Sequence, residues 1–165
     1  MARRAAVEVE LVPIEVLRPH EQVVPDKVDQ LERMTLRWKA YTKPLLIDRK
    51  TGTILDGHHR TEVARRLKLK CLPCVSVDYL DDDGIILNIW PKSGRDSLDK
   101  SEVIEAALSG ELFPPKTSRG KANLFRHVDR LKAFHHLLQR LLQYGLLLRA
   151  CHYQLHNFQD SIREG

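Results

Sequence analysis

The chain has 165 residues, of which 42% are hydrophobic and 30% are charged, and 27 Lys and Arg against 22 Asp and Glu give it a net charge of +5. This composition is typical of a globular domain with a buried core, and it excludes a disordered chain. The positive charge favours an anionic partner, which could be nucleic acid, a phosphorylated metabolite or a nucleotide.

The cysteines and the apolar runs bear on where the protein works. Three cysteines and a basic start without an apolar segment predict a cytoplasmic protein rather than a secreted disulfide scaffold. The longest apolar run, LLQYGLLLRA, is too short to span a bilayer, so we expect no membrane partner. Cys71 and Cys74 form a C-L-P-C motif, which suits a zinc half-site or a redox pair. We interpret them as strand residues, because no second pair follows at finger spacing.

The first third of the chain predicts a strand, a helix and a hairpin. Residues 6–12 alternate between apolar and acidic side chains, as an edge strand does. Pro25 then opens a helix over 25–41. Its core-facing positions recur at helical spacing: Val28, Leu31, Met34 and Trp38. Two apolar arms flank Lys50-Thr51-Gly52 and predict a hairpin whose second arm ends at Asp56.

The remaining segments alternate between helix and strand. A helix is expected over 58–69, a strand over 72–80 and a turn over 81–84. A further helix begins at Asp99 or Ser101 and closes at Gly110. Residues 112–121 have the composition of an ordered loop, and 122–165 predict one or two helices. The expected fold class is therefore α+β, with a small mixed sheet, flanking helices and a helical C-terminal tail.

The stretch Asp56-Gly57-His58-His59-Arg60 stands where the hairpin meets the next helix. A helix N-terminus presents unpaired backbone N–H groups at the positive end of the helix dipole, which makes a ready anion site. Gly57 permits close backbone approach, and the His and Arg side chains add donors. Asp56 suits a metal ion or the orientation of a histidine. In an equally supported alternative, Asp56 caps the helix and its neighbours are solvated.

These residues also carry a resemblance. A strand leading into D-G-H-H-R and a helix ending in A-x-x-L looks like the core motif of the ParB/sulfiredoxin superfamily, and the DGHHR version resembles its free serine kinases. His20-Glu21 lies where those kinases place a catalytic glutamate. The segment VIEAALSGELFPPKTSRGK is similar to their P-P-K-T-T-R-H signature. The resemblance covers about Leu11 to Arg119, and it departs from the pattern at Ser118 and Gly120.

The resemblance implies a kinase that transfers phosphate from ADP or ATP to free L-serine, giving O-phosphoserine for cysteine biosynthesis. Glu21 would accept the hydroxyl proton, since a glutamate with a reference pKa of about 4.3 is ionised at neutral pH. Asp56 would hold Mg²⁺ or orient the hydroxyl. Two sets would contact the phosphates or the serine carboxylate: Gly57, His58, His59 and Arg60, and Lys116, Thr117, Ser118 and Arg119. Trp90 would lie near the serine.

The chain is predicted to divide into three segments. Residues 1–80 would form the nucleotide-binding core and 81–121 the substrate side with the PPKT loop, whereas 122–165, a helical tail of unknown role, lies outside the resemblance. The tail contains a hydrophobic stripe at helical spacing, formed by Leu131, Leu137, Leu138, Leu141 and Leu142. This stripe could form a homo-oligomer, could belong to a degenerate or truncated paralogue that dimerises, or could equally pack on its own domain.

Two other superfamily functions compete with the kinase. A ParB-like nucleotide switch or DNA-binding protein would suit the basic charge. It gives the PPKT loop no role, and the tail shows no evident helix-turn-helix, so we do not expect nucleic acid as a partner. A sulfiredoxin-like reductase uses a cysteine where this chain has His58, and without that thiolate it has no nucleophile. The choice between ADP and ATP stays open.

Overall fold

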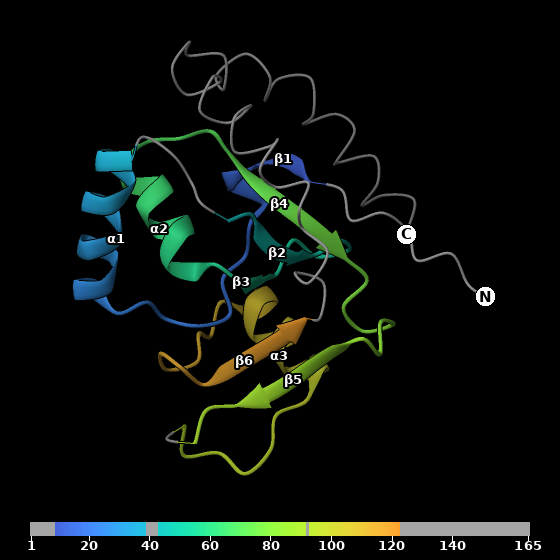
Figure 1. Cartoon of the computed structure of the whole chain (residues 1–165). Coiled ribbons are helices and arrows are strands. Elements are labelled where there is room, and N and C mark those ends of the chain that lie inside the picture. Colours follow the sequence, from blue (N-terminus) through green and yellow to red (C-terminus); the bar gives the residue numbers. More distant parts are fainter. Residues whose placement is uncertain (1–8, 39–42, 92, 123–165) are drawn as a thin grey trace.

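The structure of the protein is a computed structural model that describes residues 9–38, 43–91 and 93–122. The expected tail and its leucine stripe therefore lie outside the described residues, apart from Ala122. The described part is α+β, with a small mixed sheet and flanking helices as predicted (Figure 1). The division of the chain at residues 80 and 121 stays a prediction.

The main sheet has four strands in the described part of the chain, in the order β1-β4-β2-β3. Their bounds are β1 Glu10–Pro13, β2 Leu45–Asp48, β3 Ile54–Asp56 and β4 Cys71–Val77. β2 and β4 are parallel, whereas β1 pairs with β4 and β2 with β3 in the antiparallel sense. The predicted edge strand and the predicted hairpin ending at Asp56 are both confirmed.

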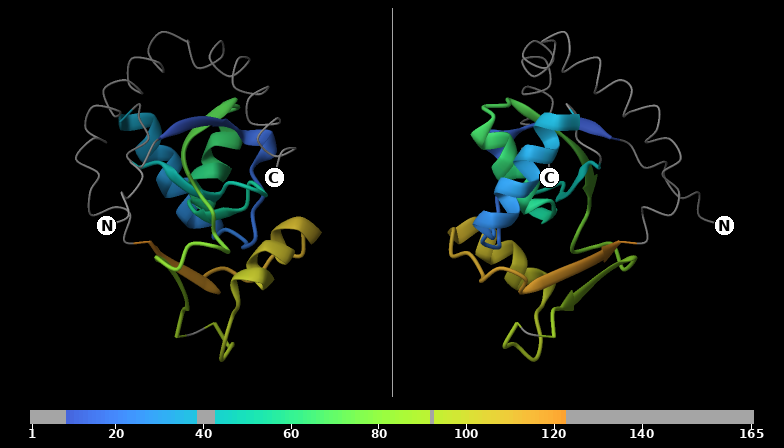
Figure 2. Two further views of the ribbon diagram at one scale, coloured as in Figure 1. Left: turned by 90° about the vertical axis from the view of Figure 1, so that its right-hand side faces the viewer. Right: turned by 60° about the vertical axis from the view of Figure 1, so that its left-hand side comes forward.

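Helices and a second layer cover both faces of this sheet. β2 is buried along its whole length. Leu45 and Ile47 pack into one apolar cluster with Ala64 of α2 (His58–Arg66), whereas Leu46 packs into another with Val103 of α3 (Lys100–Ser109). α1 (Pro25–Trp38) lies beside α2 (Figure 2). Burial on both faces explains why β2 is a continuous apolar run.

The helix boundaries follow local signals. α1 begins at Pro25. α3 begins after Asp99, whose backbone N–H donates to the Glu102 carboxylate in a capping box. Gly110, with φ 78°, ends α3. One expectation is wrong: Trp38 is 46% exposed. Trp38 follows Val28 by ten residues, which places the two side chains about 80° apart around the helix axis. Trp38 therefore lies outside the buried stripe of α1.

A second, two-stranded sheet corrects the predicted loop over 112–121. β5 (Ile85–Ile89) pairs antiparallel with β6 (Ser118–Ala122), with Ile89 opposite Ser118. The second half of the expected loop is thus a strand. No local sequence pattern predicted β6, because its partner strand β5 lies about thirty residues earlier. α3 and this sheet lie together below the main sheet in Figures 1 and 2.

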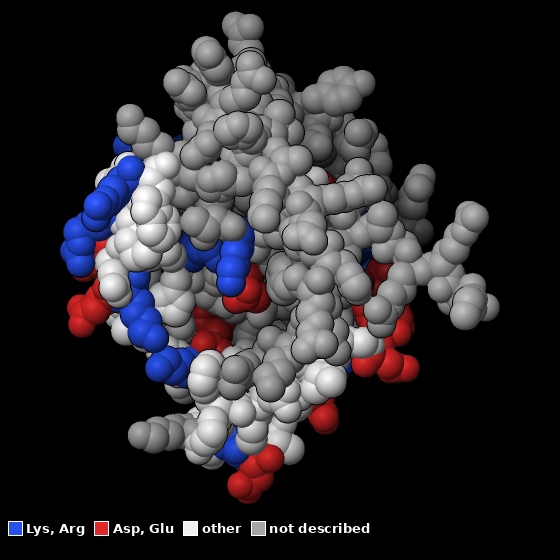
Figure 3. Space-filling model, in the orientation of Figure 1, with Lys and Arg blue, Asp and Glu red and all other residues white. Residues whose placement is uncertain are grey.

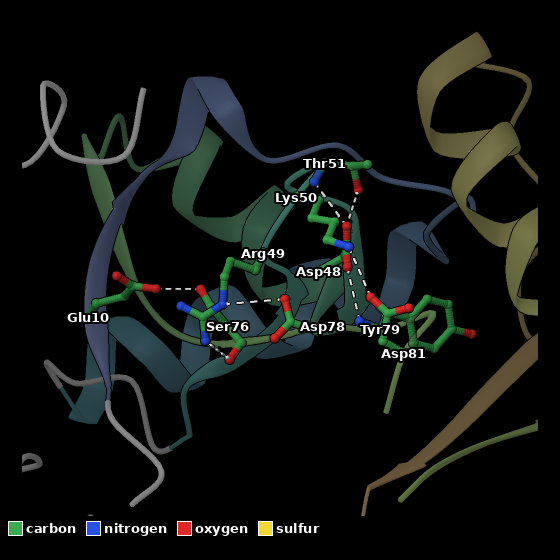
Figure 4. A network of polar contacts seen from close by, with 9 residues as sticks. All are labelled: Glu10, Asp48, Arg49, Lys50, Thr51, Ser76, Asp78, Tyr79 and Asp81. Carbon is green, nitrogen blue, oxygen red and sulfur yellow. Dashed lines mark hydrogen bonds and ion pairs between the residues drawn. The ribbon is translucent and has the colours of Figure 1, made fainter. Parts of the chain in front are cut away.

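The turn between β2 and β3 is held by a buried aspartate. The Asp48 carboxylate, 3% exposed, accepts hydrogen bonds from the Thr51 N–H and hydroxyl at 2.9 and 2.7 Å and from the Tyr79 N–H at 3.1 Å (Figure 4). Gly52 has φ 71°, and a Cβ there would overlap the Val16 carbonyl oxygen. These contacts fix the hairpin from within.

The cysteine pair belongs to the core. Cys71 and Cys74 are both buried in β4, as the interpretation as strand residues predicted. Burial raises the pKa of the Cys74 thiol above its usual range. Among the described helices, none has the length and apolarity that crossing a membrane requires.

Candidate active site

The segment 18–22, between the 3₁₀ turn η1 (Ile14–Val16) and α1, joins the two sheets. Arg18 forms a parallel bridge with Thr53, beside β3. Three residues later, Glu21 forms a parallel bridge with Phe113, ahead of the PPKT loop. The glutamate that the resemblance singled out is therefore held at the junction between the sheet that carries DGHHR and the loop that carries PPKT.

The Glu21 carboxylate is held by three successive backbone N–H groups of that loop. Its Oε1 accepts a hydrogen bond from the Lys116 N–H at 2.5 Å. Its Oε2 accepts from the N–H groups of Thr117 at 3.2 Å and Ser118 at 3.0 Å, and it lies 3.1 Å from the Ser118 hydroxyl. Successive N–H groups of this kind form a concave anion site, here filled by a carboxylate of the same chain.

The sequence of the loop explains this geometry. Pro114 and Pro115 stiffen the approach, and Lys116 takes a positive φ of 63°, which turns the following N–H groups in one direction. The Thr117 hydroxyl donates to the Pro114 carbonyl at 2.8 Å, and Thr117 is 1% exposed. Thr117 therefore shapes the loop through its side chain and contacts Glu21 only through its backbone.

His20 connects the parts of the site, although no role was predicted for it from the sequence. Its Nδ1 lies 2.7 Å from the Ile54 carbonyl oxygen of β3, and its Nε2 lies 2.7 Å from the Ser118 hydroxyl. Its ring meets the His58 ring edge-on, with centroids 4.5 Å apart. The side chain is 1% exposed, and burial lowers its pKa.

The junction of β3 and α2 has the geometry of an anion site. Gly57 precedes α2 with φ 117°, and a Cβ there would lie 2.8 Å from the Leu45 side chain. Glycine has no side chain to cap the helix, and the first turn of α2 contains no acid, so the positive end of the helix dipole at His58 and His59 suits an anion. The expected helix start within DGHHR is confirmed.

Both histidines of DGHHR accept hydrogen bonds from the segment before α1. His58 Nε2 accepts the His20 N–H at 3.4 Å, and His59 Nε2 accepts the Val24 N–H at 3.2 Å. Burial lowers the pKa of both, well below the usual value for His58, and Lys27 further lowers the pKa of His59. Neutral rings of this tautomer leave Nδ1–H as the donor for a phosphate.

Asp56 and Arg60 contact each other at the start of α2. The Arg60 guanidinium donates to Asp56 Oδ2 at 2.9 Å and to the Lys43 and Pro44 carbonyls, each at 2.7 Å. The arginine side chain is 14% exposed, whereas that of Asp56 is 55% exposed. Arg60 thus fixes Asp56 beside the helix N-terminus, and its expected phosphate contact stays a prediction.

Two lysines and a tryptophan lie around the PPKT loop. Lys116 Nζ lies 5.8 Å from the centre of the Trp90 ring. The backbone N–H of Trp90 donates a hydrogen bond to the Thr117 carbonyl at 3.3 Å. The charge of Lys116 lowers the pKa of Lys27, in the first turn of α1. Basic side chains line the edge formed by α1 (Figure 3). Two neighbouring cations favour an anion between them.

The structure thus brings Glu21, Lys116, Thr117, Ser118 and Trp90 together, with His58 and His59 joined to them through the segment before α1. Arg119 lies in β6 opposite Asn88, and its predicted contact to substrate stays untested. No sequence pattern pointed to His20 or Lys27. The signal for His20 was its position beside Glu21, but its partners lie far away along the chain.

Comparison with known proteins supports the resemblance. No protein-family model matches the chain. It is 26% identical over 124 residues to an ADP-dependent L-serine kinase of Thermococcus kodakarensis and 28% identical over 98 residues to an ATP-dependent L-serine kinase of Staphylothermus marinus, segments that cover 64% and 57% of this chain. A ParB-like protein of Sulfolobus acidocaldarius is 35% identical over 72 residues, 44% of this chain. The matches cover 51%, 38% and 36% of those proteins, so the chain spans about half of their length or less.

Solved structures show the fold. A glutamate-to-glutamine variant of a free serine kinase in complex with AMP matches with a TM-score of 0.64 and 17% identity, covering 72% of this chain and 89% of that one. A conserved hypothetical protein from Pyrococcus furiosus matches with a TM-score of 0.63 and 18% identity, covering 72% and 93%. The described chain therefore has the fold of the free serine kinases, and the predicted fold class is confirmed.

Proposed function

We propose that the chain is a kinase that transfers the terminal phosphoryl group of ADP or ATP to the hydroxyl of free L-serine. The similar L-serine kinases support the reaction, and the site described above supports it in this chain. The product, O-phosphoserine, would feed cysteine biosynthesis. Since nucleotide donors are cytoplasmic metabolites, we place the reaction in the cytoplasm.

The observation that carries the proposal is the environment of Glu21. Phosphoryl transfer needs a positioned acceptor for the hydroxyl proton. Three backbone donors hold the Glu21 carboxylate, and two of them are directed at Oε2. Oε1 accepts only the Lys116 N–H among the contacts of the described residues, so it keeps a lone pair for a substrate hydroxyl.

The donor phosphates would lie at the start of α2. The N–H groups that follow Gly57 and the Nδ1–H groups of His58 and His59 suit a nucleotide phosphate. Lys27 and Lys116 would neutralise charge on the transferring group from the opposite side, as phosphoryl transfer requires. Trp90 would pack against the serine.

Mg²⁺ fits Asp56 when the ion arrives with the nucleotide. No group of three or more His, Cys, Asp and Glu side chains among the described residues could hold a metal by itself. Mg²⁺ commonly takes one or two carboxylates and completes its shell with phosphate oxygens and water. Asp56 is half-exposed and oriented by Arg60, which suits that mode. The ion would supply charge neutralisation.

A ParB-like nucleotide switch is the second candidate, because a ParB-like protein is among the relatives. The two functions share the anion site at DGHHR but differ at the loop. A switch needs no fixed carboxylate, whereas in this chain the PPKT loop holds Glu21 with three backbone donors. This contact favours the kinase.

The test is formation of O-phosphoserine from L-serine, Mg²⁺ and either ADP or ATP. We expect product with at least one donor, and about a 100-fold or greater loss in Glu21→Gln, in line with removal of a general base. Glu15→Gln is the matched control, since Glu15 is exposed in η1 a few residues earlier. Nucleotide binding without product from either donor would favour the switch.

A further inference from the structure

One half-buried hydroxyl group beside Glu21, that of Ser118, lies within hydrogen-bond distance of two acceptors. The Ser118 Oγ lies 2.7 Å from His20 Nε2 and 3.1 Å from Glu21 Oε2. A serine hydroxyl carries a single hydrogen, so it can donate fully to only one of them. Which acceptor receives it depends on the protonation of His20.

The tautomer of His20 is set by its other nitrogen. Nδ1 lies 2.7 Å from the Ile54 carbonyl oxygen, which can only accept, so Nδ1 carries a hydrogen in every state. In the neutral ring Nε2 is therefore an acceptor, and the Ser118 hydroxyl donates to it. Glu21 Oε2 then loses this donor and keeps its backbone contacts.

Adding one proton reverses the direction of the chain. Nε2–H then donates to Ser118 Oγ, and the Ser118 hydroxyl donates to Glu21 Oε2. The Glu21 carboxylate then gains a hydrogen-bond donor, and the positively charged His20 ring lies two hydrogen bonds away from it. Both changes weaken Glu21 as a base. The array is thus balanced between two states that differ by a single proton on His20.

The surroundings isolate this array. Behind His20 and Ser118 lies a small cavity, large enough for about one water molecule and otherwise lined mainly by apolar side chains of both sheets and of α3, such as Leu46 and Val103. The titratable groups facing His20 are Glu21 on its own segment and His58 on α2. Burial lowers the pKa of His58 and keeps its ring neutral, so Glu21 is the charged neighbour that raises the pKa of His20.

We propose that His20 and Ser118 are positioning residues that set the base strength of Glu21, withdrawing the Ser118 hydroxyl from the carboxylate when His20 is neutral and returning it when His20 is protonated. The proposal rests on the proposed function, since it concerns the base of that reaction. It also gives a reason for a hydroxyl residue at position 118, where the resembled kinases have threonine.

The kinetic test compares the pH profile of kcat in the wild type, Ser118→Ala and Ser118→Thr. The quantity compared is the ratio of kcat in Ser118→Ala to kcat in the wild type at each pH, so a loss of a substrate contact that is the same at every pH cancels. On acidification we expect kcat of the wild type to fall relative to that of Ser118→Ala, by up to about tenfold, because protonated His20 returns the hydroxyl to Glu21 and one hydrogen bond to the carboxylate weakens it as a base. Ser118→Thr keeps the wild-type profile. A Ser118→Ala to wild-type ratio that stays constant with pH would overturn the proposal.

A second measurement does not depend on activity. In ¹⁵N-histidine NMR spectra of the full chain, we expect His20 to protonate at lower pH in Glu21→Gln than in the wild type, because a negative neighbour is lost. Thr35→Ala, which removes a buried hydroxyl bound to Leu31, is the control and leaves His20 unchanged. A His20 that titrates identically in Glu21→Gln and the wild type refutes the coupling. Coupling without product from any donor would support the coupling and reject the kinase.

Discussion

Asp48 and Glu21 are both carboxylates bound by backbone N–H groups, yet they differ in what surrounds them. Asp48 is almost fully buried, and its donors come from its own turn and from Tyr79 just beyond β4. Glu21 is half-buried, and its donors come from a loop 95 to 97 residues later. Both oxygens of Asp48 face protein, whereas Glu21 lies close to histidines and lysines.

The comparison shows how a structural acid differs from a candidate catalytic one. Satisfied hydrogen bonds do not separate them, since both carboxylates have several. The difference is that Asp48 joins its own turn to the residue after β4, whereas Glu21 joins two segments that each contain site residues. The predictions below use this contrast, and each changes one region while the other serves as reference.

The largest effect is expected when the length of the Glu21 side chain changes. Glu21→Asp keeps the charge but withdraws the carboxylate by one methylene, so it no longer meets both the loop and a substrate hydroxyl. We expect kcat for O-phosphoserine formation to fall about 100-fold, as a 1 Å misplacement can cause, with little change in Tm. The reciprocal Asp48→Glu should lower Tm and keep kcat, and an active Glu21→Asp variant would argue against a positioned base.

Removing the Asp48 carboxylate should reduce stability instead of catalysis. Asp48→Ala leaves the buried Tyr79 N–H without its acceptor, and we expect a loss of about 3 kcal/mol in the free energy of unfolding. This corresponds to a fall in Tm of roughly 6–12 °C for a chain of this size, measured by calorimetry. Asp78→Ala is the control, because Asp78 is an exposed acid paired with Arg49 at 3.7 Å, and it should change stability by less than about 0.5 kcal/mol.

Gly52 and Gly57, which both have positive φ, offer a smaller version of the same contrast. Gly52→Ala would overlap a backbone carbonyl and should cost about 2 kcal/mol or more, while nucleotide affinity is unchanged once the protein is folded. Gly57→Ala meets the side chain of Leu45, which can shift, and should cost about 1–2 kcal/mol. Calorimetric titration with ADP should show weaker binding in Gly57→Ala alone, and equal losses in both would contradict an anion site at α2.

The smallest expected effect is a pH dependence of stability from the site region. Burial and Lys27 lower the pKa of His59 in the folded protein, so the folded state binds fewer protons than the unfolded state below about pH 6.5. The contribution of His59 is complete above this pH and is lost as the pH falls through the lowered pKa. It should amount to less than about 1 kcal/mol, since the ring is partly exposed.

Urea unfolding at pH 7.5 and 5.0 checks this expectation. His59→Gln keeps an acceptor for the Val24 N–H but cannot take up the proton, so the variant should lose less stability on acidification than the wild type. The hairpin around Asp48 contains no histidine and should not contribute. An equal acid-dependent loss in both proteins would mean that His59 does not titrate between these pH values.

The sequence by itself determined the elements that depend on neighbouring residues. Pro25, Asp99 and Gly110 mark helix ends through local geometry, and the Lys50-Thr51-Gly52 turn defines a hairpin, so these were predicted correctly. The anion site at DGHHR was predicted from the residues at a helix start, whereas Glu21 and the PPKT loop came from the resemblance. Each is a short run of residues that can be recognised without a partner.

The tertiary structure alone decided which groups meet. Ser118 lies 98 residues from His20 along the chain, and β6 pairs with β5 about thirty residues before it. No periodicity records such pairings, since a strand or a hydroxyl has the same local pattern with any partner. For this reason the sequence could name Glu21 but not His20, and it could place Arg60 in a phosphate site without showing that Asp56 and two carbonyls already bind its guanidinium.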